Sequence, residues 1–123
     1  MYVAAVDTAQ RRLTFDLIQF LTGDAAHDAY VKDHPDDPEG PPNDYYIVND
    51  NPQLRTLPVE PGLQVTVYWL GRGGAGTERI GFDELMDYFA TNLAPEDGYL
   101  WFAPFWLTVR DGVVVAMDEQ FIP

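Results

Sequence analysis

Two short apolar segments at the end of the chain, separated by a tight turn, most constrain its fold. Residues 105–109 and 113–117 are rich in β-branched and aromatic side chains, and Asp111-Gly112 lies between them. An Asp-Gly pair between two strand-forming segments is a strong indicator of a β-hairpin, because the tight turn requires positive φ angles and glycine adopts them without strain. The chain is therefore expected to be rich in β structure.

The turn of this hairpin can close in two ways, and the choice decides which side chains face the core. A two-residue turn at Asp111-Gly112 would place Val109 opposite Val114. A three-residue loop that includes Arg110 places Val109 opposite Val113. It also gathers six apolar side chains on one face: Phe105, Leu107, Val109, Val113, Val115 and Met117. Because a one-residue slip moves every side chain to the other face, this segregation favours the three-residue loop.

The composition describes a chain that can bury a core and that carries a strong negative charge. Its 123 residues are 46% hydrophobic, and 20 acidic residues against 7 basic ones give a net charge of −13. This length predicts a single domain over residues 1–123. The charge disfavours nucleic acids and favours cations and basic partners. No apolar run approaches the roughly 18 residues of a membrane span.

Residues 2–6 and 12–17 are expected to form a first hairpin, and alternating apolar positions predict a strand over 63–69. These three strands and the final hairpin are the five principal strands, and residues 45–48 are a further short strand candidate. A short helix is expected from Thr22 to about Lys32. Helical spacing predicts an amphipathic helix over 82–91, with four core residues: Phe82, Leu85, Met86 and Phe89. The chain is thus mainly β with one or two helices, an α+β protein. Its order matches a five-stranded OB-like barrel, and a curled antiparallel sheet with a packed helix is the alternative.

A glycine-rich stretch, Gly71–Gly76, matches the G-x-G-x-x-G pattern of dinucleotide sites. In such sites a helix begins at the glycines, so that its amide groups face the pyrophosphate. Here residues 77–81 intervene before the predicted helix, and the chain lacks a repeated βαβ pattern. A connecting loop is the favoured interpretation.

An acidic, proline-rich stretch over 33–44 has no periodic pattern and is expected to be a surface loop or partly disordered. Calcium prefers carboxylate oxygens, so four residues of this loop are candidate ligands: Asp33, Asp36, Asp37 and Glu39. Their spacing is not that of an EF-hand, and a solvated acidic loop is the default interpretation. Calcium is the one cofactor that the sequence suggests.

The segment after this loop combines tyrosines with turn-forming residues. Seven side chains form a candidate binding surface for a protein or a small molecule: Asp44, Tyr45, Tyr46, Asn49, Asp50, Asn51 and Arg55. Asparagine and aspartate bond to nearby backbone amides, so a locked turn is the structural alternative. In that case Arg55 would pair with Asp50 or Asp44.

Residues suited to catalysis are few, and no enzyme is expected. The chain contains no serine and no cysteine, so the commonest nucleophiles are absent. Both histidines, His27 and His34, lie in sequence that is expected to be mobile, a poor position for an oriented base. A carboxylate-based enzyme is the alternative, because the separation of two carboxylates is set by tertiary structure.

Several segments of the chain resemble small bacterial proteins of the exported or lipoprotein type, a family with no known activity. The similarity lies in residues 13–16, 20–23, 43–47, 49–52, 54–58, 105–112 and 119–123. It implies an extracytoplasmic setting. The chain opens on Met1-Tyr2-Val3 with no charged and apolar leader, so no signal peptide is expected and a cytosolic location stays open.

These observations lead to an ordered set of hypotheses. The first is a non-catalytic binding or accessory domain of the bacterial envelope. The second is a small calcium-binding domain, and the third is a carboxylate-based enzyme.

Overall fold

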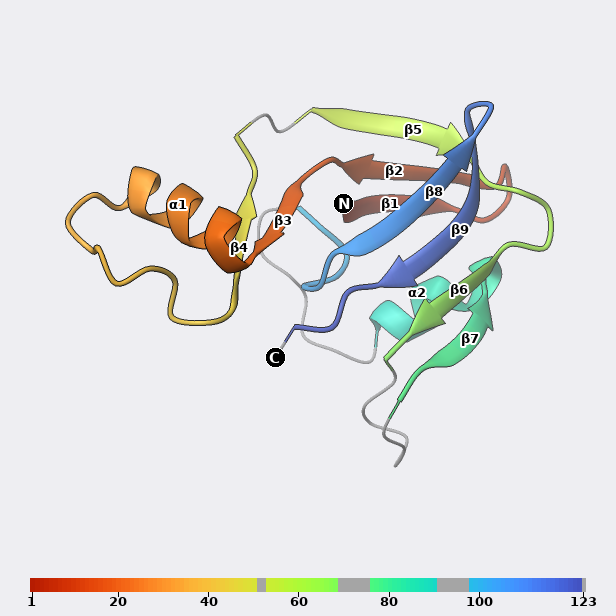
Figure 1. The fold of residues 1–123 in the computed structure, drawn as a ribbon. Coiled ribbons are helices and arrows are strands. Elements are labelled where there is room, and N and C mark those ends of the chain that lie inside the picture. Colours follow the sequence, from red (N-terminus) through yellow and green to blue (C-terminus); the bar gives the residue numbers. More distant parts are fainter. Residues whose placement is uncertain (51–52, 69–75, 91–97, 123) are drawn as a thin grey trace. The chain divides into compact units, whose positions relative to one another are not determined.

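A computed structural model describes the chain outside residues 51–52, 69–75, 91–97 and 123 (Figure 1). The described chain forms two compact units. Unit 1 comprises Met1–Asp16 and Gln53–Ile122, and unit 2 comprises Leu17–Pro52. Strands predominate over two helices, so the predicted α+β class with mainly β structure is confirmed. That residues 1–123 act as a single domain stays a prediction.

Unit 1 contains two sheets. The first is antiparallel with the order β1-β2-β5 and is formed by β1 (Tyr2–Asp7), β2 (Arg12–Asp16) and β5 (Leu54–Pro58). The second has the order β7-β6-β9-β8 and is formed by β6 (Gln64–Val67), β7 (Glu78–Gly81), β8 (Phe105–Arg110) and β9 (Val113–Glu119). In it, β6 and β9 run parallel and the other neighbours run antiparallel. Neither sheet closes into a barrel within the described residues, so the OB-like barrel is not confirmed.

The turn between β8 and β9 has two residues, and the predicted three-residue loop is wrong. Arg110 pairs directly with Val113. The two residues between them, Asp111 and Gly112, have φ angles of 52° and 76°. A type I′ turn requires positive φ at both central positions, and its twist matches the right-handed twist of the strands that it joins. This match favours the shorter turn, although only one of its two residues is a glycine.

A β-bulge in the same hairpin changes which residues are buried. Val109 lies opposite Val114, but the next pair along is offset by one residue, which leaves Val115 as the extra residue of β9. Because a bulge interrupts the alternation of side chains, Val114 and Met117 are both buried although they are three positions apart. Val109 is 46% exposed and Val113 is half-buried. The predicted inward face is therefore wrong near the turn.

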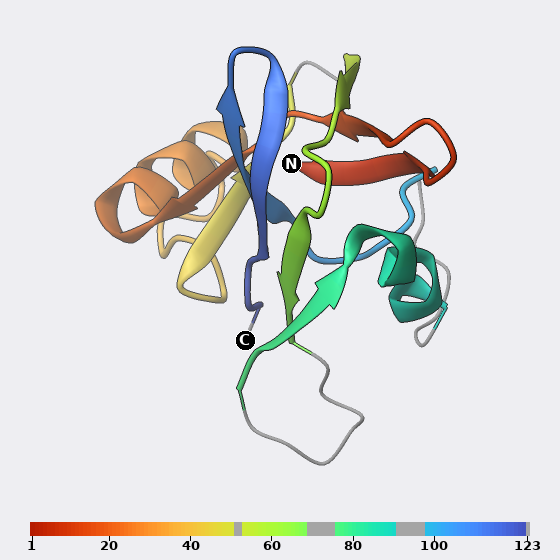
Figure 2. The same ribbon diagram turned by 90° about the vertical axis from the view of Figure 1, so that its right-hand side faces the viewer.

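The predicted helix over 82–91 begins as a 3₁₀ turn, η2 (Phe82–Glu84), and continues as α2 (Leu85–Phe89). The two form the teal coil in Figure 2. Three of its four expected core residues are buried, but Met86 is 42% exposed and Tyr88 is buried in its place. A 3₁₀ turn has three residues per turn rather than 3.6. It therefore shifts the following residues around the helix axis.

The hydrophobic core of the described chain belongs entirely to unit 1. Its buried members come from both sheets, from η2 and α2, and from the segments between them: Met1, Val3, Leu13, Phe15, Val59, Leu63, Val65, Val67, Ile80, Phe82, Leu85, Tyr88, Phe89, Trp101, Ala103, Phe105, Val114 and Met117. No helix in the described residues is long and apolar enough to cross a membrane.

Unit 2 consists of a two-stranded sheet and one helix. Its elements are β3 (Gln19–Thr22), α1 (Gly23–Asp33) and β4 (Tyr45–Val48). β3 and β4 pair antiparallel, with Thr22 opposite Tyr45. The predicted helix and the predicted strand at 45–48 are confirmed. The glycine motif lies outside the described residues, except for Gly76.

Candidate functional site

Aromatic side chains join α1 to β4 in unit 2. Tyr30 and His34 are one helical turn apart, and their rings stack with centroids 4.2 Å apart. Tyr46 of β4 meets the ring of Tyr30 edge-on at 5.4 Å. Ala26, one turn before Tyr30, is the fully buried residue of the helix. These contacts between α1 and β4 hold the helix against the β3-β4 sheet.

Two carboxylates of the acidic stretch are bound by these tyrosines. The hydroxyl of Tyr46 donates a hydrogen bond to Asp33 at 2.7 Å, and that of Tyr30 donates one to Asp37 at 2.9 Å. Each bond raises the pKa of its tyrosine, because the phenolate form would face a carboxylate without a proton to donate. The acidic stretch is therefore tied to α1 and β4 at its beginning.

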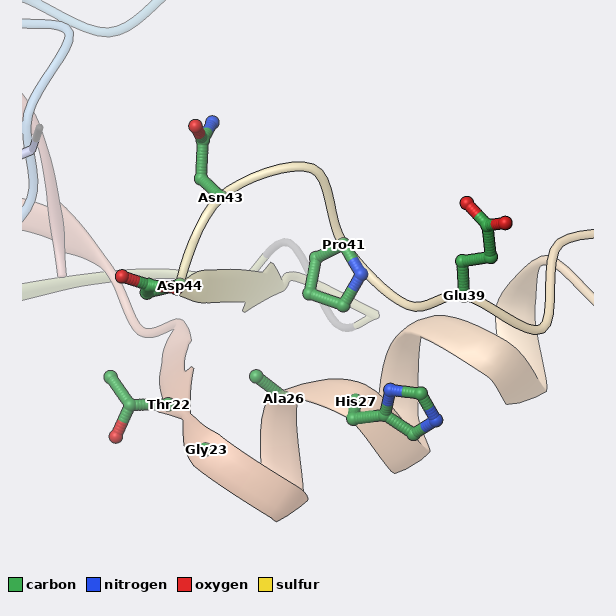
Figure 3. A pocket seen from close by; sticks show the side chains of 8 residues that line it. All are labelled: Thr22, Gly23, Ala26, His27, Glu39, Pro41, Asn43 and Asp44. Carbon is green, nitrogen blue, oxygen red and sulfur yellow. The ribbon is translucent and has the colours of Figure 1, made fainter.

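A pocket of about 450 Å³ lies between the first turns of α1 and the segment that leads into β4 (Figure 3). Eight residues line it: Thr22, Gly23, Ala26, His27, Glu39, Pro41, Asn43 and Asp44. In Figure 3, Glu39 and Asn43 point away from the helix, at the rim. The lining offers hydroxyl, imidazole, amide and carboxylate groups beside apolar surface of similar extent. Such a lining suits a small ligand that has both polar and apolar parts.

The wall of the pocket depends on a glycine. Gly40 is buried, has a φ of 92°, and lies against the ring of His27. A Cβ atom at this position would come within 2.5 Å of Nδ1 of His27. Only glycine therefore lets the loop approach the helix this closely without displacing the imidazole.

The candidate binding residues have different positions in the structure. Asp44 lines the pocket, and Tyr45 stacks on Phe20 of β3 with ring centroids 5.2 Å apart. Tyr46 packs on α1. Asn49 is half-buried and Asp50 is exposed, both in unit 2, and Arg55 is exposed on β5 of unit 1. Asn51 lies outside the described residues.

The four candidate calcium ligands do not form a group. Asp33 and Asp37 accept hydrogen bonds from different tyrosines, and Asp36 and Glu39 are exposed. Within the described ranges, no three histidine, cysteine or acidic side chains gather where they could hold a metal ion. Calcium binding stays a prediction without a ligand cluster to support it.

Sequence reasoning missed a buried carboxylate in unit 1. Glu119 is 8% exposed, and both of its oxygens accept hydrogen bonds. Oε1 accepts from the Tyr88 hydroxyl at 2.7 Å and from the indole of Trp101 at 2.6 Å. Oε2 accepts from the backbone amide of Tyr68 at 2.8 Å. Burial raises the pKa of Glu119, and these hydrogen bonds oppose the rise.

The hydrogen bonds of Glu119 indicate a structural role for this carboxylate. Its donors come from the end of β6, from α2 and from the segment before β8, so one side chain joins four parts of the core. Burial and the bond to Glu119 raise the pKa of Tyr88 as well. A signal for this residue exists in the sequence, since Glu119 is two positions after Met117 and shares its face of β9.

The pocket of unit 2 is the candidate site, because it is concave and is lined by two of the predicted residues, Glu39 and Asp44. It also contains residues that sequence reasoning did not select, Thr22 and His27 among them. Comparison with protein-family models, with curated proteins and with solved structures finds no match for this chain.

Proposed function

We propose that this chain is a non-catalytic binding domain and that its insertion, residues 17–52, carries the binding surface. β2 and β5 pair directly, with Asp16 opposite Leu54, so a short turn would suffice to join them. A compact unit with its own helix, two-stranded sheet and pocket intervenes instead. Long connections of this kind often carry function on a stable scaffold. This topology is the observation that supports the proposal most strongly.

The charge of the insertion suggests the class of ligand. It holds eight of the 20 acidic residues, one of the seven basic residues and both histidines. Two carboxylates, Glu39 and Asp44, line the pocket itself. The N-terminus of α1 contributes roughly half a positive charge, which is less than these two carboxylates supply. The proposed ligand is a small organic cation.

A titration tests this function. Spermidine is added to the labelled protein, and amide shifts are followed by NMR. Shifts are expected at Thr22, His27 and Asp44. Replacing Asp44 by Asn is expected to weaken binding by about tenfold, because a charge-assisted hydrogen bond is lost. The matched control, Asp36→Asn, removes the same charge from an exposed residue outside the pocket. Equal weakening by both variants would show a nonspecific charge effect and contradict the proposal.

An envelope setting is part of this proposal, and its support is the resemblance of the sequence to exported bacterial proteins in residues 13–16, 20–23, 43–47, 49–52 and 54–58. A binding or accessory role suits a domain without a predicted nucleophile. Fractionation of cells that express the natural gene is the test. Recovery of the protein only with cytosolic markers would contradict this setting.

We also infer an OB-type strand order for unit 1. Two connections between its sheets support this order. Val59, which follows β5, forms a parallel bridge with Val114 of β9, and the amide of Phe105 donates to the carbonyl of Met1 at 2.8 Å. The parallel pairing of β6 with β9 also supports the strand order of the predicted barrel, and so does the position of α2 before β8. Amide exchange is the test, with slow exchange expected at Phe105 and at Glu60, whose amide donates to the carbonyl of Val114 at 2.9 Å.

A further inference from the structure

The four-stranded sheet of unit 1 has two contrasting faces. Residues that pair directly across β8, β9, β6 and β7 form rows, and the members of a row share one face. One row is apolar and turned inward: Leu107, Met117, Val65 and Ile80. The next row is turned outward: Trp106, Asp118, Thr66 and Arg79. We call this second row the outer row.

Trp106 presents an aromatic face at one end of the outer row. Its side chain is 55% exposed, an unusual exposure for so large an apolar group. The indole N–H donates to Oε1 of Gln120 at 2.7 Å, which fixes the ring and satisfies its one donor. Within the described chain the ring contacts no other aromatic ring. Thr108 and Ala116, the next pair on this face, are small and leave space beside the ring.

Polar groups of complementary kinds continue the outer row. Asp118 supplies a hydrogen-bond acceptor, Thr66 a group that both donates and accepts, and Arg79 a set of donors. Neither Asp118 nor Arg79 takes part in an ion pair with a described residue. Strands lie about 4.8 Å apart, so the row extends roughly 14 Å from Trp106 to Arg79. This length matches a short oligosaccharide rather than a single small ion.

We propose that the outer row is a saccharide-binding surface. The C–H face of a sugar ring stacks on Trp106, since both surfaces are apolar and flat. The hydroxyl groups of the following sugars, which donate and accept, bond to Asp118, Thr66 and Arg79. The net charge of −13 disfavours a nucleic acid, whose bases could also stack on tryptophan. A neutral saccharide meets no such repulsion.

This inference is independent of the proposed function of the insertion. The outer row belongs to unit 1, whereas the cation pocket belongs to unit 2. A protein that binds spermidine and no saccharide would contradict the inference alone. A protein that binds a saccharide through Trp106 and no cation would contradict the proposed function alone.

The experiment is a titration of the full chain with three neutral hexasaccharides: cellohexaose, maltohexaose and hexa-N-acetylchitohexaose. NMR amide shifts and tryptophan fluorescence are recorded up to about 10 mM, a range that detects weak binding. With at least one of them, shifts are expected at Trp106, Asp118, Thr66 and Arg79. Replacing Trp106 by Ala is expected to weaken binding by about tenfold or more. Trp106→Phe keeps a ring for stacking and is expected to weaken binding by about threefold or less.

The matched control is Leu54→Ala, because Leu54 is 58% exposed and lies on the other sheet. It is expected to leave the affinity unchanged, and thermal melts check that all variants are folded. Absence of shifts in the outer row with all three sugars would overturn the inference. So would equal weakening by Leu54→Ala and Trp106→Ala, or binding of oligo(dT) in place of the sugars.

Discussion

Glu119 and Asp16 are the two buried acidic residues of the described chain, and each accepts a hydrogen bond from a tyrosine. Tyr99 donates to Asp16 at 2.6 Å and stacks on Tyr2. A buried carboxylate costs free energy unless donors surround it. At Glu119 three donors partly offset this cost, and the raised pKa shows that burial outweighs them.

The raised pKa of Glu119 predicts a pH dependence of stability. The folded chain binds the proton of this carboxyl more tightly than the unfolded chain does. The contribution of Glu119 to the free energy of unfolding is therefore greatest below the ordinary pKa of glutamate and falls as the pH rises through the folded-state pKa. Glu119→Gln removes this fall. Urea unfolding of both proteins from about pH 4 to about pH 8 measures it.

The amide of Glu119→Gln also places an N–H group among donors, which lowers stability by about 1–3 kcal/mol at every pH. The titration of Glu119 is therefore reported only by how the difference in free energy of unfolding between wild type and Glu119→Gln changes with pH. Glu60→Gln, at an exposed position, is the control and is expected to follow the wild type. A constant difference between Glu119→Gln and the wild type across the pH range would contradict the assignment.

Gly40 gives a second prediction at this scale. Gly40→Ala combines strain at positive φ with a clash against His27, and it is expected to cost about 1–3 kcal/mol in the stability of unit 2. Gly23→Ala is the matched control in the same unit, since its φ is 59° and a Cβ there meets nothing within 4 Å. Amide exchange of α1 and β4 measures the effect. Adding His27→Ala to Gly40→Ala is expected to recover part of the loss, and no recovery would contradict the clash.

At the scale of elements, the β8-β9 hairpin shows how turn geometry and core burial combine. The type I′ turn sets one register, and the bulge at Val115 then shifts it by one residue. As a result, Val114 and Met117 both reach the core. The hydrophobic pattern alone favoured a uniform alternation, which the structure does not follow.

Substitution of valines tests this register. Val114→Ala is expected to cost about 2 kcal/mol in the free energy of unfolding, because two buried methyl groups are lost. Val109→Ala, its cross-strand partner, is expected to change stability by less than about 0.5 kcal/mol, because that side chain is exposed. Urea denaturation measures both. The three-residue loop would have predicted the larger loss at Val109, so that result would refute the observed register.

At the scale of the whole molecule, residues 17–52 are an insertion between paired strands. The described core is supplied by unit 1 alone, and the two ends of the insertion meet where Asp16 lies opposite Leu54. This topology separates the residues that stabilise the sheets from those proposed to bind a cation.

Replacing residues 17–53 by Asn-Gly tests that separation. The shortened chain is expected to unfold cooperatively and to keep the amide shifts of β6 and β9, because no core residue has been removed. It is also expected to lose the binding of spermidine. Loss of cooperative unfolding would show that the insertion is required for the core.

Local signals predicted much of the fold and part of the site. The β1-β2 hairpin, α1, β4 and the existence of the β8-β9 hairpin follow from patterns within a few residues. Asp44 was predicted as a binding residue and Glu39 as a calcium ligand, and both line the pocket. His27 and Thr22 were not predicted, because they line the pocket with residues up to 22 positions away. No short pattern records such a contact.

The sequence by itself determined the β-rich class, the position of the helices and the acidic character of the insertion, since these depend on residue type and short-range spacing. The tertiary structure alone decided the bulge at Val115, the 3₁₀ start of the second helix, the donors around Glu119 and the outer row. Each of these depends on which distant strands become neighbours. That choice is made by the burial of the whole core, to which many distant residues contribute together.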